Sequence, residues 1–245
     1  MPKVLKIPEI YCGCSGWYYS WNPELSLDWY VSNSGLNAIE VNASFYRFPF
    51  PNQVKAWARK GKQLKWVIKV NRLITHRFKF GQRALEIFRN FRELFEPLEK
   101  YIAFYLFQLP PSTTPNSAEK IASFLKHANL ERKVAIEPRN LKWFTKEWLN
   151  WAKEKNITWV SVDCPDLPRD IYKTTNFVYV RMHGRTAWYA HDYSQEELKD
   201  VAKRILATEP KAAYVFFNND HDMLNNAQQM YLILNRMAKG QKKLL

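Results

Sequence analysis

The chain has 245 residues, and 47% of them are hydrophobic, which indicates a globular protein with enough apolar material for a large core. No run approaches the roughly 18 consecutive apolar residues of a membrane span. Residues 1–10 lack the long apolar segment of a signal peptide. We therefore expect a cytoplasmic protein with no membrane partner.

The formal net charge of +14 bears on the partners of the protein. A strongly basic protein attracts polyanions, so nucleic acid or a phosphorylated small molecule is the expected partner. The Lys and Arg residues are dispersed rather than gathered in a basic tail, so a solvated, lysine-rich surface explains the charge equally well. Both interpretations stay open on the sequence alone.

The cysteines are Cys12, Cys14 and Cys164. An odd number in a long chain is not typical of a disulfide framework. Cys12 and Cys14 share one face of a predicted strand, but the chain has no second closely spaced cysteine pair to complete a metal site. We expect three packed, free thiols.

Eight short β-prone runs follow one another along the chain, and most are rich in Val, Ile, Phe, Tyr or Trp. They are Tyr11–Ser15, Asn37–Asn42, Lys65–Asn71, Ile102–Gln108, Lys133–Glu137, Ile157–Asp163, Phe177–His183 and Ala213–Asn218. Amphipathic stretches separate most of them, a pattern typical of βαβ units in a parallel sheet. Eight such units in about 250 residues predict a single-domain (β/α)8 TIM barrel spanning the whole chain.

Several of the helical stretches carry clear sequence signals. Apolar residues within 87–98 recur at the spacing of one helical stripe. Asn116 with Glu119 predicts the start of a further helix, and Ser194 with Glu197 predicts a capping box before another.

The crossover between the sixth and seventh strands is predicted to be irregular. Pro165 and Pro168 stand within the thirteen residues that separate Asp163 from Phe177. Two prolines leave little room for a regular helix, so we expect a loop there.

Polar or charged residues close nearly every predicted strand. In a parallel barrel the C-terminal strand ends form the active face, so these side chains are expected to converge on one mouth. They are Ser15, Glu40, Asn42, Lys69, Asn71, Gln108, Glu137, Asp163, Arg181, His183 and Asn218.

Two sets of candidate residues follow from this placement. The candidate catalytic residues are Glu137, His183, Asp163 and Glu40. The candidate anion-binding or substrate-binding residues are Lys69, Arg181, Arg185, Asn71, Gln108, Asn218, Trp17 and Tyr46.

Two chemistries fit these sets. In the first, Glu40, Glu137, Asp163 and His183 hold a divalent metal, the one cofactor that the residue types suggest. In the second, the Lys and Arg side chains bind phosphate while a carboxylate or His183 moves a proton. A structural ion-pair network, such as Glu137 with Arg181, is the alternative to both.

Aromatic residues are abundant in the loops predicted to surround the mouth. Trp17 follows the first strand, Tyr46 follows the second beside Arg47, and Trp188 and Tyr189 follow the seventh. Aromatic rings interleaved with Arg can stack on bases or sugars. They can equally form lids packed over the end of the barrel.

Seven segments together resemble the DUF72 or YecE-like family over nearly the whole chain. They are Gly13–Trp17, Glu40–Arg47, Lys69–His76, Phe107–Ser112, Ala135–Arg139, Tyr179–Arg185 and Phe216–Asp220. The resemblance implies a TIM barrel similar to those of endonuclease IV and the xylose-isomerase-like enzymes. It implies no established activity. The His-rich metal ligands of endonuclease IV have no residue-by-residue match in this sequence.

The sequence thus predicts a barrel that binds an anionic ligand at its C-terminal mouth. The first functional hypothesis is a nucleic-acid-associated phosphoesterase or a nucleic-acid-binding protein. The second is a sugar or sugar-phosphate isomerase or hydrolase with Glu137 and His183 as acid and base. The third is a binding module without catalysis. Basic residues clustered at the mouth favour nucleic acid, whereas a closed pocket of sugar size favours the second hypothesis.

Overall fold

The chain folds around a closed barrel of parallel strands, as predicted. A computed structural model describes residues 7–241. Each strand pairs in parallel with the next one in chain order, and β8 pairs with β1 to close the barrel. The strands are β1 (Glu9–Cys14), β2 (Ala38–Val41), β3 (Lys65–Lys69), β4 (Ile102–Gln108), β5 (Val134–Glu137), β6 (Thr158–Asp163), β7 (Phe177–Met182) and β8 (Ala212–Phe217).

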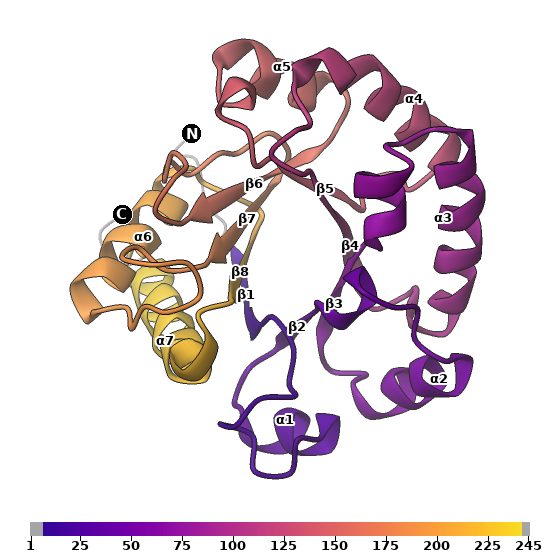
Figure 1. The fold of residues 1–245 in the computed structure, drawn as a ribbon. Helices are drawn as coiled ribbons and strands as arrows, with labels where there is room; N and C mark the ends of the chain where they lie inside the picture. The colour runs from indigo at the N-terminus through magenta and orange to yellow at the C-terminus, as the bar shows by residue number, and fades with distance from the viewer. Residues whose placement is uncertain (1–6, 242–245) are drawn as a thin grey trace, which may run out of the picture.

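Helices form an outer ring around this barrel, which Figure 1 shows in a view down the barrel axis. They are α1 (Leu27–Asn33), α2 (Pro51–Lys60), α3 (Gln82–Leu94), α4 (Ala118–Ala128), α5 (Lys146–Glu154), α6 (Gln195–Ala207) and α7 (Met223–Gln241). Short helical turns lie in the loops: η1 (Ala43–Phe45), η2 (Leu73–Arg77), η3 (Glu96–Leu98), η4 (Pro115–Ser117), η5 (Leu141–Trp143) and η6 (Asp220–Asp222). Among residues 7–241, no helix has both the length and the apolarity needed to cross a membrane.

The predicted irregular crossover between β6 and β7 is confirmed, because residues 164–176 contain no helix. This segment is tied to β6 instead. The amide of Trp159 on β6 donates to Thr174 Oγ1 at 2.9 Å, and the amide of Tyr172 donates to Ser161 Oγ on β6 at 2.8 Å. These two hydrogen bonds attach the crossover to β6, and Ile171 and Tyr172 pack against the core.

Of the two predicted helix starts, the one at Ser194 is confirmed and the one at Asn116 is wrong. The amide of Glu197 donates to Ser194 Oγ at 3.2 Å and the amide of Ser194 donates to Glu197 Oε2 at 2.9 Å, which is the predicted capping box. Asn116 does not cap α4, because it lies inside η4 and α4 begins at Ala118. Pro115 favours the first position of a helical turn, and so the chain turns before Asn116.

The interior of the barrel is filled from its N-terminal end by large side chains. Val67, Phe104, Tyr179, Tyr214 and Phe216 are buried there, and the Phe104 ring lies 5.0 Å from the Tyr214 ring, centre to centre. Side chains alternate along a strand, so the next inward position toward the C-terminal end follows two residues later. Those positions carry Ser15, Glu40, Lys69, Gln108, Glu137, Arg181 and Asn218.

Candidate functional site

A single guanidinium joins two carboxylates at the C-terminal end of the barrel. Arg181 on β7 is fully buried, as are Glu40 on β2 and Glu137 on β5. Arg181 donates from Nε and Nη2 to the two oxygens of Glu40, at 2.9 and 2.5 Å, and from Nη1 to Glu137 Oε2 at 2.5 Å. Charge-assisted, bidentate bonds of this kind hold both carboxylates in fixed positions.

Two further hydroxyl groups complete the surroundings of Glu40. Ser15 Oγ donates to Glu40 Oε1 at 2.7 Å, and the Tyr179 hydroxyl donates to Glu40 Oε2 at 2.5 Å. Burial raises the pKa of Tyr179 well above its ordinary value, so the phenol remains a proton donor. Tyr179 was not among the candidate residues. Its position two residues before Arg181, on the same strand face, is a signal that could have identified it.

The second half of the network contains Arg139 and His183. Arg139 donates from Nε and Nη2 to Glu137 Oε1, and Nη2 also lies 3.2 Å from His183 Nε2. The Trp188 ring covers the Arg139 guanidinium, with 4.4 Å between the ring centre and Cζ. Arg139 was likewise missing from the candidate residues, although it stands two residues beyond Glu137.

The ionisation states of this network are set by burial and by its guanidinium groups. Burial alone would raise the pKa of Glu137, but Arg139 and Arg181 hold it well below the usual range. Burial and the neighbouring Arg181 lower the pKa of His183 to about 3. At neutral pH Glu137 is therefore an anion and His183 is neutral, and neither exchanges protons readily near pH 7.

Lys69, at the end of β3, has a different environment. Its side chain is 6% exposed, and Nζ lies 4.4 Å from the centre of the Phe45 ring. Its amine forms no ion pair with any carboxylate in the described part of the chain. Burial and the neighbouring Arg181 lower the pKa of Lys69 to about 7.

A cavity of about 660 Å³ opens above Lys69 at the mouth of the barrel. This mouth cavity is lined by the aromatic side chains Trp17, Tyr18, Tyr19, Tyr46, Trp57 and Tyr189 and by polar groups that include Ser15, Asn42 and Asn218. Its size is that of pockets that hold small molecules. Another cavity, of about 580 Å³, lies beside α4 and contains none of the strand-end residues.

The candidate binding residues fall into two groups. Lys69, Asn218, Trp17 and Tyr46 line the mouth cavity. Arg181, Arg185, Asn71 and Gln108 do not line it. Asn71 stabilises a turn, because its Nδ2 donates to Ser44 O at 2.9 Å and its Oδ1 accepts from the Leu73 amide at 3.0 Å. Gln108 is half-buried beside Glu137 in the sheet register.

The candidate catalytic residues do not form one cluster. Asp163 lies apart, where Arg185 donates to its carboxylate at 2.9–3.1 Å and the Tyr193 hydroxyl donates at 3.0 Å. Val162 packs inside the barrel, so the alternation along β6 directs Asp163 to the outer face. Sequence spacing therefore placed Asp163 at the correct end of the barrel but on the opposite side of its wall.

The predicted metal-ligand set of Glu40, Glu137, Asp163 and His183 is not formed. Within residues 7–241, no group of three or more His, Cys, Asp or Glu side chains is arranged to hold a metal ion. The Arg181 guanidinium lies between Glu40 and Glu137, and Asp163 is paired with Arg185. A cation at this position would have to displace guanidinium groups that already neutralise the carboxylates.

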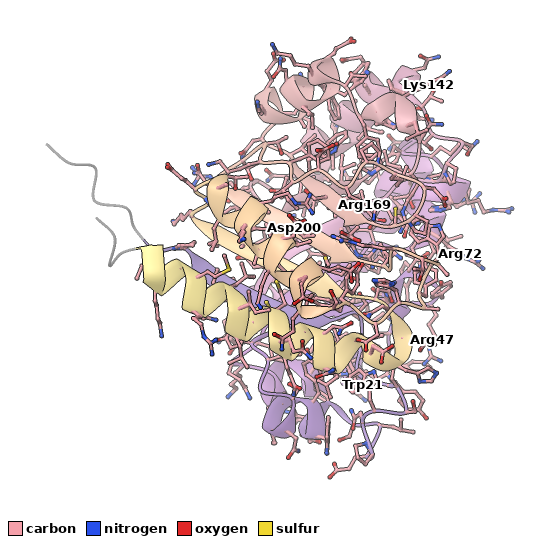
Figure 2. The ribbon with its side chains drawn as sticks, turned by 90° about the vertical axis from the view of Figure 1, so that its left-hand side faces the viewer. Trp21, Arg47, Arg72, Lys142, Arg169 and Asp200 are labelled. Atoms are coloured by element: carbon pink, nitrogen blue, oxygen red, sulfur yellow. The ribbon has the colours of Figure 1, made fainter. Side chains whose placement is uncertain are left out.

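The loops over β2 to β5 give one half of the mouth a positive charge. Residues 42–50, 70–81, 109–117 and 138–145 contain no Asp or Glu. They carry the cations Arg47, Arg72, Arg77, Lys79, Arg139 and Lys142. Figure 2 shows Arg47, Arg72 and Lys142 on the same side of the molecule. We call these four loops the basic rim.

The closed parallel barrel places the chain in the class of (β/α)8-barrel proteins, and the polar strand ends beneath the mouth cavity form its candidate site. The chain belongs to the family described as "Protein of unknown function DUF72", whose model matches residues 11–244. The resemblance noted in the sequence is thus confirmed. None of the curated proteins compared with the chain matches it.

Solved structures of the family share this barrel. A DUF72 family protein from Enterococcus faecalis V583 is 24% identical, with 92% of this chain and 95% of that chain covered and a TM-score of 0.80. A DUF72 family protein from Thermotoga maritima MSB8 is 26% identical, with 94% and 99% covered and a TM-score of 0.78.

A more distant likeness extends to a sugar epimerase. D-Psicose 3-epimerase from Clostridium cellulolyticum H10, solved with D-tagatose, is 12% identical, with 93% of this chain and 99% of that chain covered and a TM-score of 0.56. At this identity the likeness concerns the fold, and one barrel fold supports many chemistries.

Proposed function

We propose that the protein is an enzyme acting on a small, polyhydroxylated and phosphorylated ligand, such as a sugar phosphate, in the mouth cavity. The observation that carries this proposal is the cavity of about 660 Å³ with aromatic walls and Lys69 at its base. Aromatic rings pack against the apolar faces of sugar rings, and a pocket of this size has room for a small ligand. Arg47 of the basic rim lines the cavity and supplies attraction for the phosphate group.

The roles of the network residues follow from their charges. Glu137 and Glu40 are held by Arg181, so they act as fixed negative charges that orient the guanidinium and the neighbouring hydroxyls. Lys69 lines the cavity, and its pKa of about 7 makes it the group suited to exchange a proton with a ligand near neutral pH. Lys69 therefore replaces Glu137 and His183 as the proposed centre of the chemistry.

Calorimetric titration of the full chain with ribose 5-phosphate, fructose 6-phosphate and the matching free sugars tests the proposal. We expect heat of binding for at least one sugar phosphate, weaker binding of its free sugar, and loss of binding in Tyr46→Ala, since Tyr46 lines the cavity and is 67% exposed. Leu232→Ala is the matched control, because Leu232 is 66% exposed on α7. Equal binding by both variants, or no binding by the parent protein, would contradict the proposal.

Nucleic-acid binding at the same mouth is the second candidate function. The specific observation in its favour is the basic rim, in which cations and exposed aromatic residues occur together without carboxylates. Such a surface attracts phosphate backbones and offers rings on which bases can stack. Phosphodiester hydrolysis, the activity first inferred from the sequence, would then take place at the strand ends beneath the rim.

A further inference from the structure

We propose that Lys69 is a nucleophile that forms a Schiff base with the carbonyl carbon of a small hydroxylated aldehyde or ketone in the mouth cavity. This inference rests on the proposed function, because it requires a small ligand in that cavity. It goes further by naming the functional group of the ligand and the covalent bond that forms.

The position of Lys69 brings its amine to the boundary between the buried network and the cavity. Lys69 ends β3, lines the cavity, and leaves 6% of its surface exposed. The Phe45 ring, from η1, lies under Nζ at 4.4 Å, so an aromatic face rather than a carboxylate is the neighbour of the amine. A lysine amine held in this way reaches the ligand with few competing partners.

The groups that face Lys69 offer little net negative charge. They are the carboxylates Glu40 and Glu137, the guanidinium groups Arg139 and Arg181, and the imidazole His76. Each carboxylate is already bonded to a guanidinium, so the two negative and two positive charges nearly cancel. Burial, with Lys69 and Arg72 nearby, lowers the pKa of His76, which keeps that ring neutral at pH 7.

This electrostatic balance favours the neutral amine. A buried lysine without a compensating anion loses the hydration that stabilises its charged form. Its pKa falls to about 7, so a large share of Lys69 is neutral at physiological pH. A desolvated lysine beside another cationic group is a recognised form of activated amine nucleophile.

The proposed step is balanced and needs no oxidant or reductant. The Nζ lone pair forms a bond to the carbonyl carbon, and the carbonyl π electrons move to its oxygen. Transfer of a proton from nitrogen to oxygen gives a carbinolamine. One further proton from solvent releases that oxygen as water and leaves a protonated C=N bond. Such a bond withdraws electrons from the adjacent carbon atoms, which suits isomerisation or cleavage next to a carbonyl group.

Reductive trapping of the full chain tests the inference. The probe is dihydroxyacetone phosphate, added with sodium cyanoborohydride and followed by intact mass and peptide mapping. We expect one equivalent of reduced adduct on Lys69, no such adduct in Lys69→Arg or Lys69→Met, and an unchanged adduct in Lys142→Arg. Lys142 is the matched control because it is an exposed lysine of the basic rim. Adduct formation should fall about tenfold between pH 6 and pH 5, as the neutral amine is depleted.

The outcomes separate this inference from the function on which it rests. Calorimetric binding of a sugar phosphate without any adduct on Lys69 overturns the Schiff base and leaves the proposed function standing. Absence of both binding and adduct overturns both. Equal labelling of Lys69 and Lys142 in the parent protein shows unselective modification and also overturns the inference. Mapping in the parent protein gives this answer even if a Lys69 variant fails to fold.

Discussion

At the scale of the residue, the charge of Arg181 influences the ionisation of three neighbouring strand-end groups, Glu137, His183 and Lys69. Its guanidinium is fully buried between two carboxylates. Pairing of the three charges offsets the free-energy cost of removing them from water. The same pairing keeps Glu137 ionised and His183 neutral, and it leaves Lys69 as the buried cation without a carboxylate partner in the described chain.

Removal of the Arg181 charge should be strongly destabilising. Arg181→Met leaves Glu40 and Glu137 buried without their partner, so we expect a loss of about 3–5 kcal/mol in the free energy of unfolding. Lys60→Met is the control, since Lys60 pairs with Asp28 at the exposed surface and its loss should cost less than about 1 kcal/mol. Urea denaturation of both variants measures the difference. Similar losses in both would mean that the buried bridge contributes no more than a surface pair.

Lys69 should leave a signature in the pH dependence of stability. Its pKa is about 7 in the folded protein against 10.5 ordinarily, so between these values the unfolded chain binds more protons and stability rises with pH. The Lys69 contribution should amount to about 1.3 kcal/mol per pH unit between about pH 8 and 9.5. Lys69→Met should lack it, whereas Lys142→Met should retain it. Urea titrations at several pH values that give parallel curves for parent and Lys69→Met would contradict the lowered pKa.

At the scale of the element, period-two alternation explains what could be predicted and what could not. The β-prone runs and their polar ends were enough to predict the strand order and the end of the barrel at which Glu40, Glu137 and Arg181 lie. Spacing does not reveal which partner a side chain meets, so the sequence left Arg181 with two possible partners, an anionic ligand or Glu137. The structure shows the ion pair with Glu137 and a second one with Glu40. Val162 faces the inside of the barrel, so its neighbour Asp163 must face outward. This alternation could have excluded Asp163 from the group of inward-facing strand-end residues.

The contact of Lys69 with Phe45 shows a second limit of the sequence. Phe45 belongs to η1, in the loop between β2 and α2, and its ring reaches the end of β3 only through the course of that loop. Ser44 holds the loop there, since its hydroxyl lies 2.7 Å from Val41 O and 2.6 Å from Lys69 O and can donate its one proton to either carbonyl oxygen. Loop conformation of this kind depends on tertiary contacts rather than on local periodicity, so the burial of Lys69, which is the main cause of its low pKa, could not be foreseen.

The pair Asp163 and Arg185 connects the end of β6 to the loop between β7 and α6. In that loop the amide of Gly184 donates to the Tyr193 hydroxyl at 2.8 Å, and Tyr193 in turn donates to Asp163. Because Tyr189 of the same loop lines the mouth cavity, this pair fixes one wall of the proposed binding site.

Asp163→Asn should therefore loosen that loop without unfolding the barrel. Loss of the charge-assisted bonds, worth about 1.5–3 kcal/mol, predicts roughly 10- to 100-fold faster amide exchange at Gly184 and Tyr189. The exchange rates of α6 should stay unchanged. Asp200→Asn, on the exposed face of α6, is the control. Hydrogen exchange followed by mass spectrometry measures both, and equal protection of the loop in Asp163→Asn and the parent would show that the pair does not anchor it.

At the scale of the whole molecule, the distribution of charge matters more than its sum. The net charge of +14 includes cations on the outer helices as well as those of the basic rim. A charge spread evenly would raise solubility and little else, whereas loops without any carboxylate concentrate positive charge over β2 to β5. Arg47 of the basic rim lines the mouth cavity, which Asp220 of η6 also lines. The positive charge of the rim serves either of the proposed ligands, a phosphorylated small molecule or a nucleic acid.

The salt dependence of DNA binding distinguishes a true nucleic-acid surface from a merely basic protein. If duplex DNA contacts the basic rim, each phosphate bound releases counterions, and the plot of log affinity against log salt has a slope of about −0.9 per contact. The triple variant Arg47→Gln, Arg72→Gln and Lys142→Gln should then bind DNA more weakly. Its negative slope should become shallower by up to about 2.7. The control places Gln at three exposed lysines of the outer helices: Lys55, Lys153 and Lys199.

Fluorescence titration of labelled duplex and single-stranded DNA at several salt concentrations provides the measurement. Both triple variants lose the same formal charge, so a difference between them reports the position of the cations and not their number. We expect the parent and the outer-helix control to share one slope and the rim variant to have a shallower one. Equal slopes for the two variants would assign the binding to charge alone. No binding by the parent at low salt would remove nucleic acid as a partner and leave the sugar-phosphate proposal as the function of the mouth.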